Sequence, residues 1–100
     1  MYNITDDYLG EMIMALRVNR TATSEAEVYD LIQAALADIG RQGAITINPT
    51  DPLIKHAVRL YCRANYGYDS GAERDRFQTA YEGLSASIAL DYDYKAGDEG

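Results

Sequence analysis

The sequence has few of the residue types from which catalytic and metal sites are built. Its 100 residues include one cysteine, Cys62, one histidine, His56, and no tryptophan. One cysteine excludes a disulfide within the chain, and one histidine excludes a pair of imidazole ligands. Because His56 and Cys62 are six residues apart in a predicted helix, they lie on different faces and do not form a base and nucleophile pair. We therefore expect no enzymatic activity, no cofactor and no metal site.

Long apolar runs, nucleotide-binding motifs and an excess of basic residues are missing as well. No stretch approaches the ~20 apolar residues of a membrane span, and the first residues lack the basic and apolar segments of a secretory signal. There is no GxGxxG motif and no P-loop. The net charge of −7 disfavours general binding to nucleic-acid phosphates, which depends on clustered Lys and Arg. The sequence therefore predicts a cytoplasmic protein with no membrane contact.

The composition is that of a folded protein built from helices. Hydrophobic residues make up 47% of the chain and charged residues 25%, which is the balance of a globular domain. Apolar residues repeat at spacings of three and four in four segments. We predict an all-α, bundle-like domain of four helices over residues 1–90. Residues 91–100, DYDYKAGDEG, lose this period and form a flexible acidic C-terminal tail.

Capping residues set the expected bounds of the first two helices. Thr5 precedes the first helix, which should end near Val18. Residues 19–23 have no period and are expected to form a loop. The second helix should open on a capping box from Ser24 to Glu27 and stop at Gly40 and Gly43.

The third and fourth helices are the most informative part of the chain. Asp51 and Pro52 are a favoured N-cap and first helical residue, and the helix that follows is apolar over about half its circumference, from Leu53 to Asn65. We expect it to be the central helix. A second capping box, from Ser70 to Glu73, opens the fourth helix. Its expected core positions are Phe77, Ala80, Tyr81, Leu84 and Ile88.

The segment that joins the second and third helices, residues 44–49, alternates β-branched and small residues. We expect a short extended loop whose two isoleucines, Ile45 and Ile47, pack onto the bundle. The other interpretation is an edge that pairs with another subunit.

Two surfaces are candidates for contact between subunits. Lys55, Arg59 and Arg63 recur every four residues and form one basic stripe, which is either a solvated face or a contact with the acidic surface or tail of an adjacent copy. The fourth helix has a face of small side chains that a neighbouring helix could approach closely: Thr79, Gly83, Ala86 and Ser87. Gly83 in mid-helix costs about 1 kcal/mol relative to Ala unless close packing offsets it.

The patterns over residues 52–90 resemble those of a known family. They comprise Ile54, Lys55, Ala57, Leu60 and Tyr61 in the third helix, the junction Tyr66-Gly67-Tyr68-Asp69, and Arg76, Phe77, Tyr81 and Leu84 in the fourth. With its small size, acidity and four helices, the chain resembles the head-tail connector proteins of long-tailed phages, also called head-completion or DNA-packaging adaptor proteins.

The resemblance implies a structural virion protein, made in the host bacterial cytoplasm and located at the head-tail interface. Such a protein forms a ring of about twelve copies below the portal protein and extends the DNA channel. DNA passes through the lumen without sequence-specific binding, and a head-closure or tail-completion protein binds the ring. Carried onto this chain, Arg59 and Arg63 become inter-subunit residues. The residues expected to contact the portal are Asp91, Tyr92, Asp93 and Tyr94.

A second class of function is also compatible with the sequence. A small helical regulator that binds one protein partner as a monomer or dimer would have the same composition. Assembly size separates the two classes, because only the connector forms a large ring.

Overall fold

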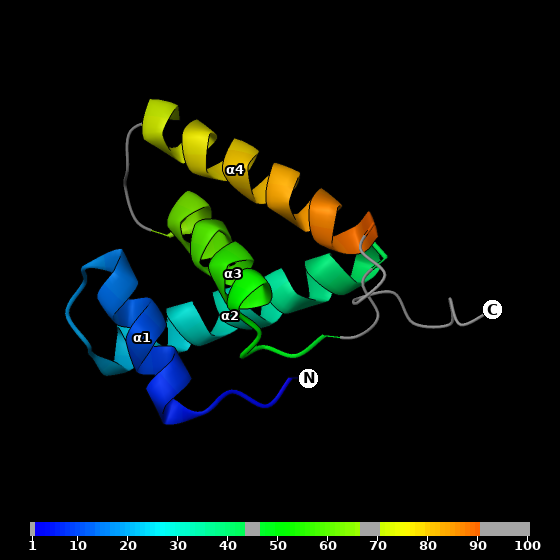
Figure 1. Ribbon diagram of the computed structural model, residues 1–100. Coiled ribbons are helices and arrows are strands. Elements are labelled where there is room, and N and C mark those ends of the chain that lie inside the picture. The colour runs from blue at the N-terminus through cyan, green and yellow to red at the C-terminus, as the bar shows by residue number, and fades with distance from the viewer. Residues whose placement is uncertain (1, 44–46, 67–70, 91–100) are drawn as a thin grey trace.

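The computed structural model describes residues 2–43, 47–66 and 71–90. These residues form four helices: α1 (Asp6–Leu16), α2 (Ala22–Arg41), α3 (Pro52–Asn65) and α4 (Gly71–Leu90). Figure 1 shows α3 in the middle, with α1 and α4 on different sides of it and α2 crossing behind. The described part of the chain contains no strand. The prediction of an all-α domain with four helices is therefore confirmed.

The residues that flank helix α1, Thr5 and Arg17, determine where it begins and ends. The Thr5 Oγ1 atom accepts a hydrogen bond from the Tyr8 backbone N–H at 3.1 Å, which satisfies one of the free amides of the first turn. The helix ends at Leu16 because Arg17 adopts the left-handed conformation, with φ 59° and ψ 41°. Its buried side chains, Tyr8, Met12 and Ile13, face α2 and α3.

Helix α2 starts earlier than the sequence indicates. The N-cap is Thr21 rather than Ser24, so residues 22 and 23 belong to the helix and the predicted loop is wrong there. Ser24 takes the third helical position, where its hydroxyl accepts from the Thr21 N–H at 2.8 Å while Thr21 Oγ1 accepts from the Ser24 N–H at 3.0 Å. A serine thus fills the place expected for Glu or Gln in a capping box.

The C-terminal end of α2 lies between the two predicted stop signals. Gly40 is still inside the helix, which ends at Arg41. Gly43 has a φ of 124°, a backbone conformation that residues other than glycine rarely adopt. Of the two isoleucines in the following loop, Ile45 lies outside the described residues, and Ile47 is half-buried against the core as predicted.

Helix α3 is the central helix. It contacts each of the other three helices. Its predicted start is confirmed, since Asp51 Oδ2 accepts hydrogen bonds from the backbone N–H groups of Leu53 and Ile54 at 3.0 and 3.3 Å. The buried face of α3 is narrower than predicted, because Leu53 is 47% exposed and Asn65 is exposed. Its fully buried members are Ile54, Ala57, Val58, Cys62 and Ala64.

Helix α4 packs on α3 and, through its C-terminal half, on α2. Tyr81 and Ile88 are buried as predicted, but Ala80 is exposed, and Ser85 is buried in its place. Tyr81 meets Tyr61 of α3 edge to face, with ring centroids 5.1 Å apart and an interplanar angle of 71°. The predicted N-cap, Ser70, and the predicted tail, 91–100, lie outside the described residues.

Candidate functional site

The small-residue face of α4 is exposed over residues 79–87. Its four predicted members, Thr79, Gly83, Ala86 and Ser87, are all exposed. A Cβ atom built on Gly83 would have no heavy atom of residues 2–43, 47–66 or 71–90 within 4 Å, its own helical surroundings aside. Leu90, which the sequence analysis did not include, continues this face at its C-terminal end and is 76% exposed. We call these five residues the outer face of α4.

The outer face lies opposite the side by which α4 is held. Tyr81, Ser85 and Ile88 are buried against α2 and α3, and at 100° per residue they lie on the other side of the helix from Gly83. Figure 1 shows α4 as the outermost helix on this side of the molecule. Within one subunit, no described residue packs on Gly83.

The inner side of α4 is fixed to α2 by a polar cluster that the sequence analysis missed. Tyr81 donates its hydroxyl hydrogen to Asp38 Oδ2 at 2.6 Å, and the Gln42 amide donates to the same oxygen at 2.9 Å. Ser85 donates to Gln42 Oε1 at 3.2 Å, and Arg41 pairs with Asp38. The predicted burial of Tyr81 could have indicated this cluster, because a buried tyrosine hydroxyl usually requires a hydrogen-bond partner.

These contacts determine the charge state of Asp38. Burial alone would raise the pKa of this carboxyl group. The hydrogen bonds from Tyr81, Arg41 and Gln42 stabilise the ionised form and outweigh burial, so the pKa is lowered from its usual value. Burial and the bond to Asp38 raise the pKa of Tyr81. The cluster therefore holds a carboxylate at neutral pH and a neutral phenol.

The basic stripe of α3 is half-buried, and two of its three members bind groups of α1. Lys55 Nζ lies 2.9 Å from Glu11 Oε1 of α1 and 5.4 Å from the centroid of the Tyr8 ring. Arg63 donates to the backbone oxygen of Ala15 at 2.9 Å. These two residues therefore attach α3 to α1.

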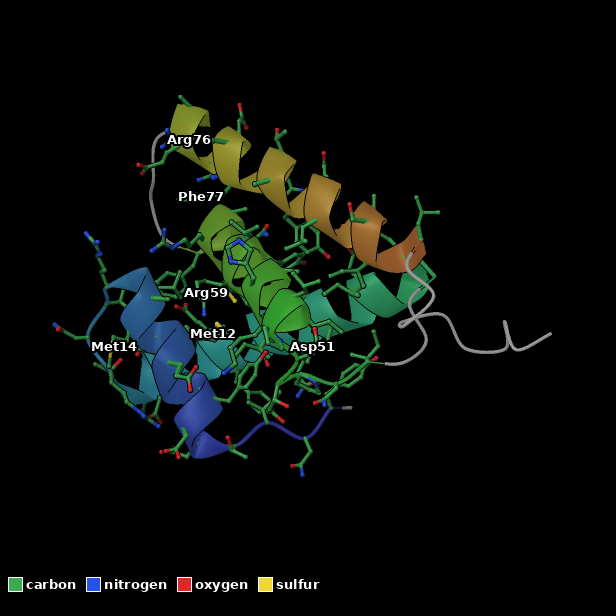
Figure 2. The ribbon with its side chains drawn as sticks, in the orientation of Figure 1. Met12, Met14, Asp51, Arg59, Arg76 and Phe77 are labelled. Carbon is green, nitrogen blue, oxygen red and sulfur yellow. The ribbon has the colours of Figure 1, made fainter. Side chains whose placement is uncertain are left out.

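Arg59, the middle residue of the stripe, has a different surrounding. Its Nη1 atom lies 3.4 Å from His56 Nδ1 on the same helix. Figure 2 shows Arg59 on the side of α3 that lies toward α1. Among the described residues, Arg59 lies near His56 of its own helix and interacts electrostatically with Tyr8 of α1, without a salt bridge to α1 such as Lys55 forms. Arg59 is therefore the member of the stripe best placed to meet another molecule.

A groove opens where the ends of all four helices come together. It has a volume of about 850 Å³ and runs between the last turn of α1 and the first turns of α4. In the described part of the chain no Cα atom of α1 comes within 8 Å of one of α4. Half-buried side chains form its walls: Leu16, Val18, Arg63, Tyr66 and Phe77. We call it the α1–α4 groove; the sequence analysis did not predict it.

Aromatic and guanidinium groups meet in this groove. The Arg63 guanidinium carbon lies 5.3 Å from the centroid of the Phe77 ring, and that of Arg76 lies 6.0 Å from the same centroid. Figure 2 shows Phe77 and Arg76 at the N-terminal end of α4. Such distances allow cation–π attraction. Arg76 also pairs with Glu73 at 3.6 Å. The groove thus combines aromatic surface with arginines and with the carboxylates of Glu27 and Glu73.

The remaining chemistry of the described residues does not converge on a reactive centre. Cys62 is buried, and burial raises the pKa of its thiol to about 12. No cluster of three or more metal-ligating side chains was found among residues 2–43, 47–66 and 71–90. In those same segments, none of the helices combines the length and the apolar character needed to cross a bilayer.

The four expected portal-contacting residues, Asp91, Tyr92, Asp93 and Tyr94, lie outside the described residues. Comparison with known proteins adds no assignment: no family model matches the chain, and the searches of curated proteins and solved structures found no match.

Proposed function

We propose that this chain is a head-tail connector protein of a long-tailed phage, a structural protein without enzymatic activity. Copies assemble into a ring below the portal, extend the DNA channel, and present a surface to a head-closure or tail-completion protein. The proposal joins the resemblance over residues 52–90 to the surfaces of the folded subunit.

The outer face of α4 is the observation that carries the proposal. A glycine inside a helix costs about 1 kcal/mol relative to alanine, and among the described residues Gly83 has no close neighbour that would offset this cost. A second helix packed on Thr79, Gly83 and Ala86 would approach closely and offset the cost. Leu90 would add buried apolar area at the end of the same contact.

The charge of the chain agrees with the passage of DNA. Acidic side chains repel phosphates over about a Debye length, ~8 to 10 Å at ordinary salt. With a net charge of −7, a ring of these subunits would not hold the DNA that moves through it.

The direct test is the mass of the assembly. The full chain is measured by light scattering, alone and after mixing with the portal ring. We expect a species of many copies in at least one of the two conditions. A mass that never exceeds a dimer in either condition would overturn the connector proposal and favour the small helical regulator.

A substitution tests whether the outer face is the contact. Ala86→Arg places a long charged side chain on this face, and Ala34→Arg, at an exposed position of α2, is the matched control. We expect Ala86→Arg to remove the large species while both variants keep the helical content of the parent. Equal assembly of both variants would show that the subunits meet elsewhere.

A further inference from the structure

Helix α1 is attached to α2 by residues that precede it and by residues that follow it. Before the helix, the Tyr2 N–H donates to Gln33 Oε1 at 2.9 Å, and Gln33 Nε2 donates to the Tyr2 backbone oxygen at 2.7 Å. After the helix, Arg20 pairs with both Asp6 of α1 and Glu25 of α2. Polar contacts from both flanking segments therefore hold α1 to α2.

The attachment of α1 to α3 has a different character. Its polar contacts come from the basic stripe: Lys55 pairs with Glu11, and Arg63 donates to the backbone oxygen of Ala15. The Glu11 side chain is 53% exposed, so dissolved salt screens its pairing with Lys55. We call the interface of the two helices the α1–α3 seam; it is formed by Tyr8, Glu11, Ala15, Lys55, Cys62 and Arg63.

A buried hydroxyl group without a partner lies inside the seam. Tyr8 is 4% exposed, and its hydroxyl is the one buried side-chain polar atom of residues 2–43, 47–66 and 71–90 that lacks a hydrogen bond. Burial raises the pKa of this hydroxyl, and so does the nearby Cys62 thiol of α3. A polar group that is buried without a hydrogen bond opposes the closed seam, because water satisfies it once the seam opens.

The other side of α3 has satisfied contacts. There the Tyr81 hydroxyl donates to Asp38, and the Tyr61 and Tyr81 rings meet edge to face. Helices α1 and α4 lie on different sides of α3 (Figure 1), and within the described residues no Cα atom of one comes within 8 Å of a Cα atom of the other. A movement of α1 away from α3 therefore leaves the contacts among α2, α3 and α4 intact.

We propose that the α1–α3 seam is a conformational switch that salt releases: α1 swings away from α3 while it stays attached to α2. This switch goes beyond the proposed function, because it needs no second copy of the chain. Opening frees Lys55 and Arg63 from α1, so that the whole basic stripe becomes available to another molecule. It also exposes Cys62, which lies about two turns after Lys55 on the same face of α3.

The single cysteine reports this opening in the unmodified chain. Burial raises the pKa of the Cys62 thiol to about 12, so the closed seam keeps it unreactive toward a maleimide. Labelling of Cys62 is measured in increasing urea, and global unfolding is followed by circular dichroism on the same protein. We expect labelling at least about tenfold faster than the unfolded fraction permits, with a weaker dependence on urea, because opening exposes less surface than unfolding. Labelling that follows global unfolding at every urea concentration would overturn the inference.

Salt separates the opening of the seam from a general loss of stability. An increase in NaCl from about 0.1 M to about 1 M shortens the Debye length from about 10 Å to about 3 Å. This weakens the pairing of Lys55 with Glu11, but it also reduces repulsion within a chain of net charge −7, which favours the folded state. We expect Cys62 labelling, relative to that of the unfolded chain, to rise about threefold while the midpoint of urea unfolding does not fall. A constant or falling labelling rate would contradict a switch that salt releases.

Charge variants test whether the movement takes place at this seam. Glu11→Lys places a like charge opposite Lys55 and should speed Cys62 labelling about fivefold, whereas Glu82→Lys, at an exposed position of α4, is the matched control and should not. Glu11→Lys combined with Lys55→Glu restores an ion pair and should restore the parent rate. Equal acceleration by the two single variants would assign the effect to net charge and refute the seam.

A thiol on the other side of α3 is the spatial control. Ser85 is buried on α4 and donates to Gln42 of α2, so Ser85→Cys in a Cys62→Ala background places the thiol away from α1. We expect residue 85 to be labelled only as fast as the unfolded fraction of that variant permits. If it is labelled ahead of unfolding by the same factor as Cys62 in the parent, the whole domain loosens and α1 does not move alone.

Discussion

The N-terminal and C-terminal halves of α4 are held very differently. From Gly71 to Ala80 no side chain is buried, and Phe77 is the largest one that is half-buried. From Tyr81 to Leu90 four side chains are buried, and the polar cluster around Asp38 attaches this half to α2. The C-terminal half of α4 therefore stabilises the subunit through its buried inner side, whereas the N-terminal half has no buried side chain.

Truncation of the large side chain in each half gives the largest expected effect. Tyr81→Ala removes a buried ring and its hydrogen bond, and should lower the free energy of unfolding by about 3–5 kcal/mol. Phe77→Ala removes a half-buried ring and should cost about 1 kcal/mol. Urea unfolding of both variants measures the difference. Equal losses would contradict the division of α4 into two halves.

A fall in pH should weaken the attachment of the C-terminal half of α4 to α2 first, because this attachment includes the carboxylate of Asp38. The pKa of Asp38 is lower in the folded protein than its usual value of 3.8. A group with a lowered folded pKa stabilises the fold above its unfolded pKa, and this stabilisation is lost as pH falls through the folded pKa. We therefore expect the free energy of unfolding to fall as the pH drops below about 4.

Asp38→Asn is the control for this pH dependence. The amide keeps the shape of the side chain but removes the charge that accepts from Tyr81, so the variant should be less stable by about 1.5–3 kcal/mol at pH 7. Its stability should also depend less on pH below 4 than that of the parent. Parallel curves for the two proteins would show that another carboxylate is responsible.

The basic stripe permits a similar comparison within α3. Arg63→Ala removes a charged hydrogen bond to Ala15 O and a contact with the Phe77 ring, and should lower stability by about 1.5 kcal/mol. Arg59→Ala removes a contact to His56 and an electrostatic interaction with Tyr8, and should change stability by less than about 0.5 kcal/mol. Thermal unfolding distinguishes them. A larger loss for Arg59→Ala would reverse the assignment of their roles.

Local signals predicted most of the fold because the ends of α1, α2 and α3 are satisfied by residues close in sequence. Thr5 and Asp51 cap their helices as expected. The start of α2 was misplaced because Thr21 and Ser24 have similar cap preference, and only the reciprocal bonds between them show which one is the N-cap.

The surfaces were harder to predict because a helical period does not say which neighbour covers which side. The helical period of α3 places Lys55 and Arg63 on one stripe, but their binding to α1 depends on where α1 lies. The α1–α4 groove is built by four chain segments, so no single pattern contains it. The outer face of α4 was found because small side chains at helical spacing are themselves a pattern.

Gly83→Ala gives the sharpest comparison between the isolated and the assembled subunit. Alanine favours the helix over glycine by about 1 kcal/mol, and a Cβ atom at residue 83 would meet no neighbour in the part of the chain that the structure describes. The isolated subunit should therefore become more stable by about that amount. In the assembly, the same methyl group would separate two closely packed helices and weaken the contact. Thermal unfolding at low concentration measures the first effect, and light scattering of the assembled species measures the second.

The control for Gly83→Ala is Ala34→Gly, at an exposed position of α2, which should lower stability without changing assembly. If Gly83→Ala stabilises the subunit and its assembly equally, the glycine is not there for close packing and the outer face of α4 is not the contact.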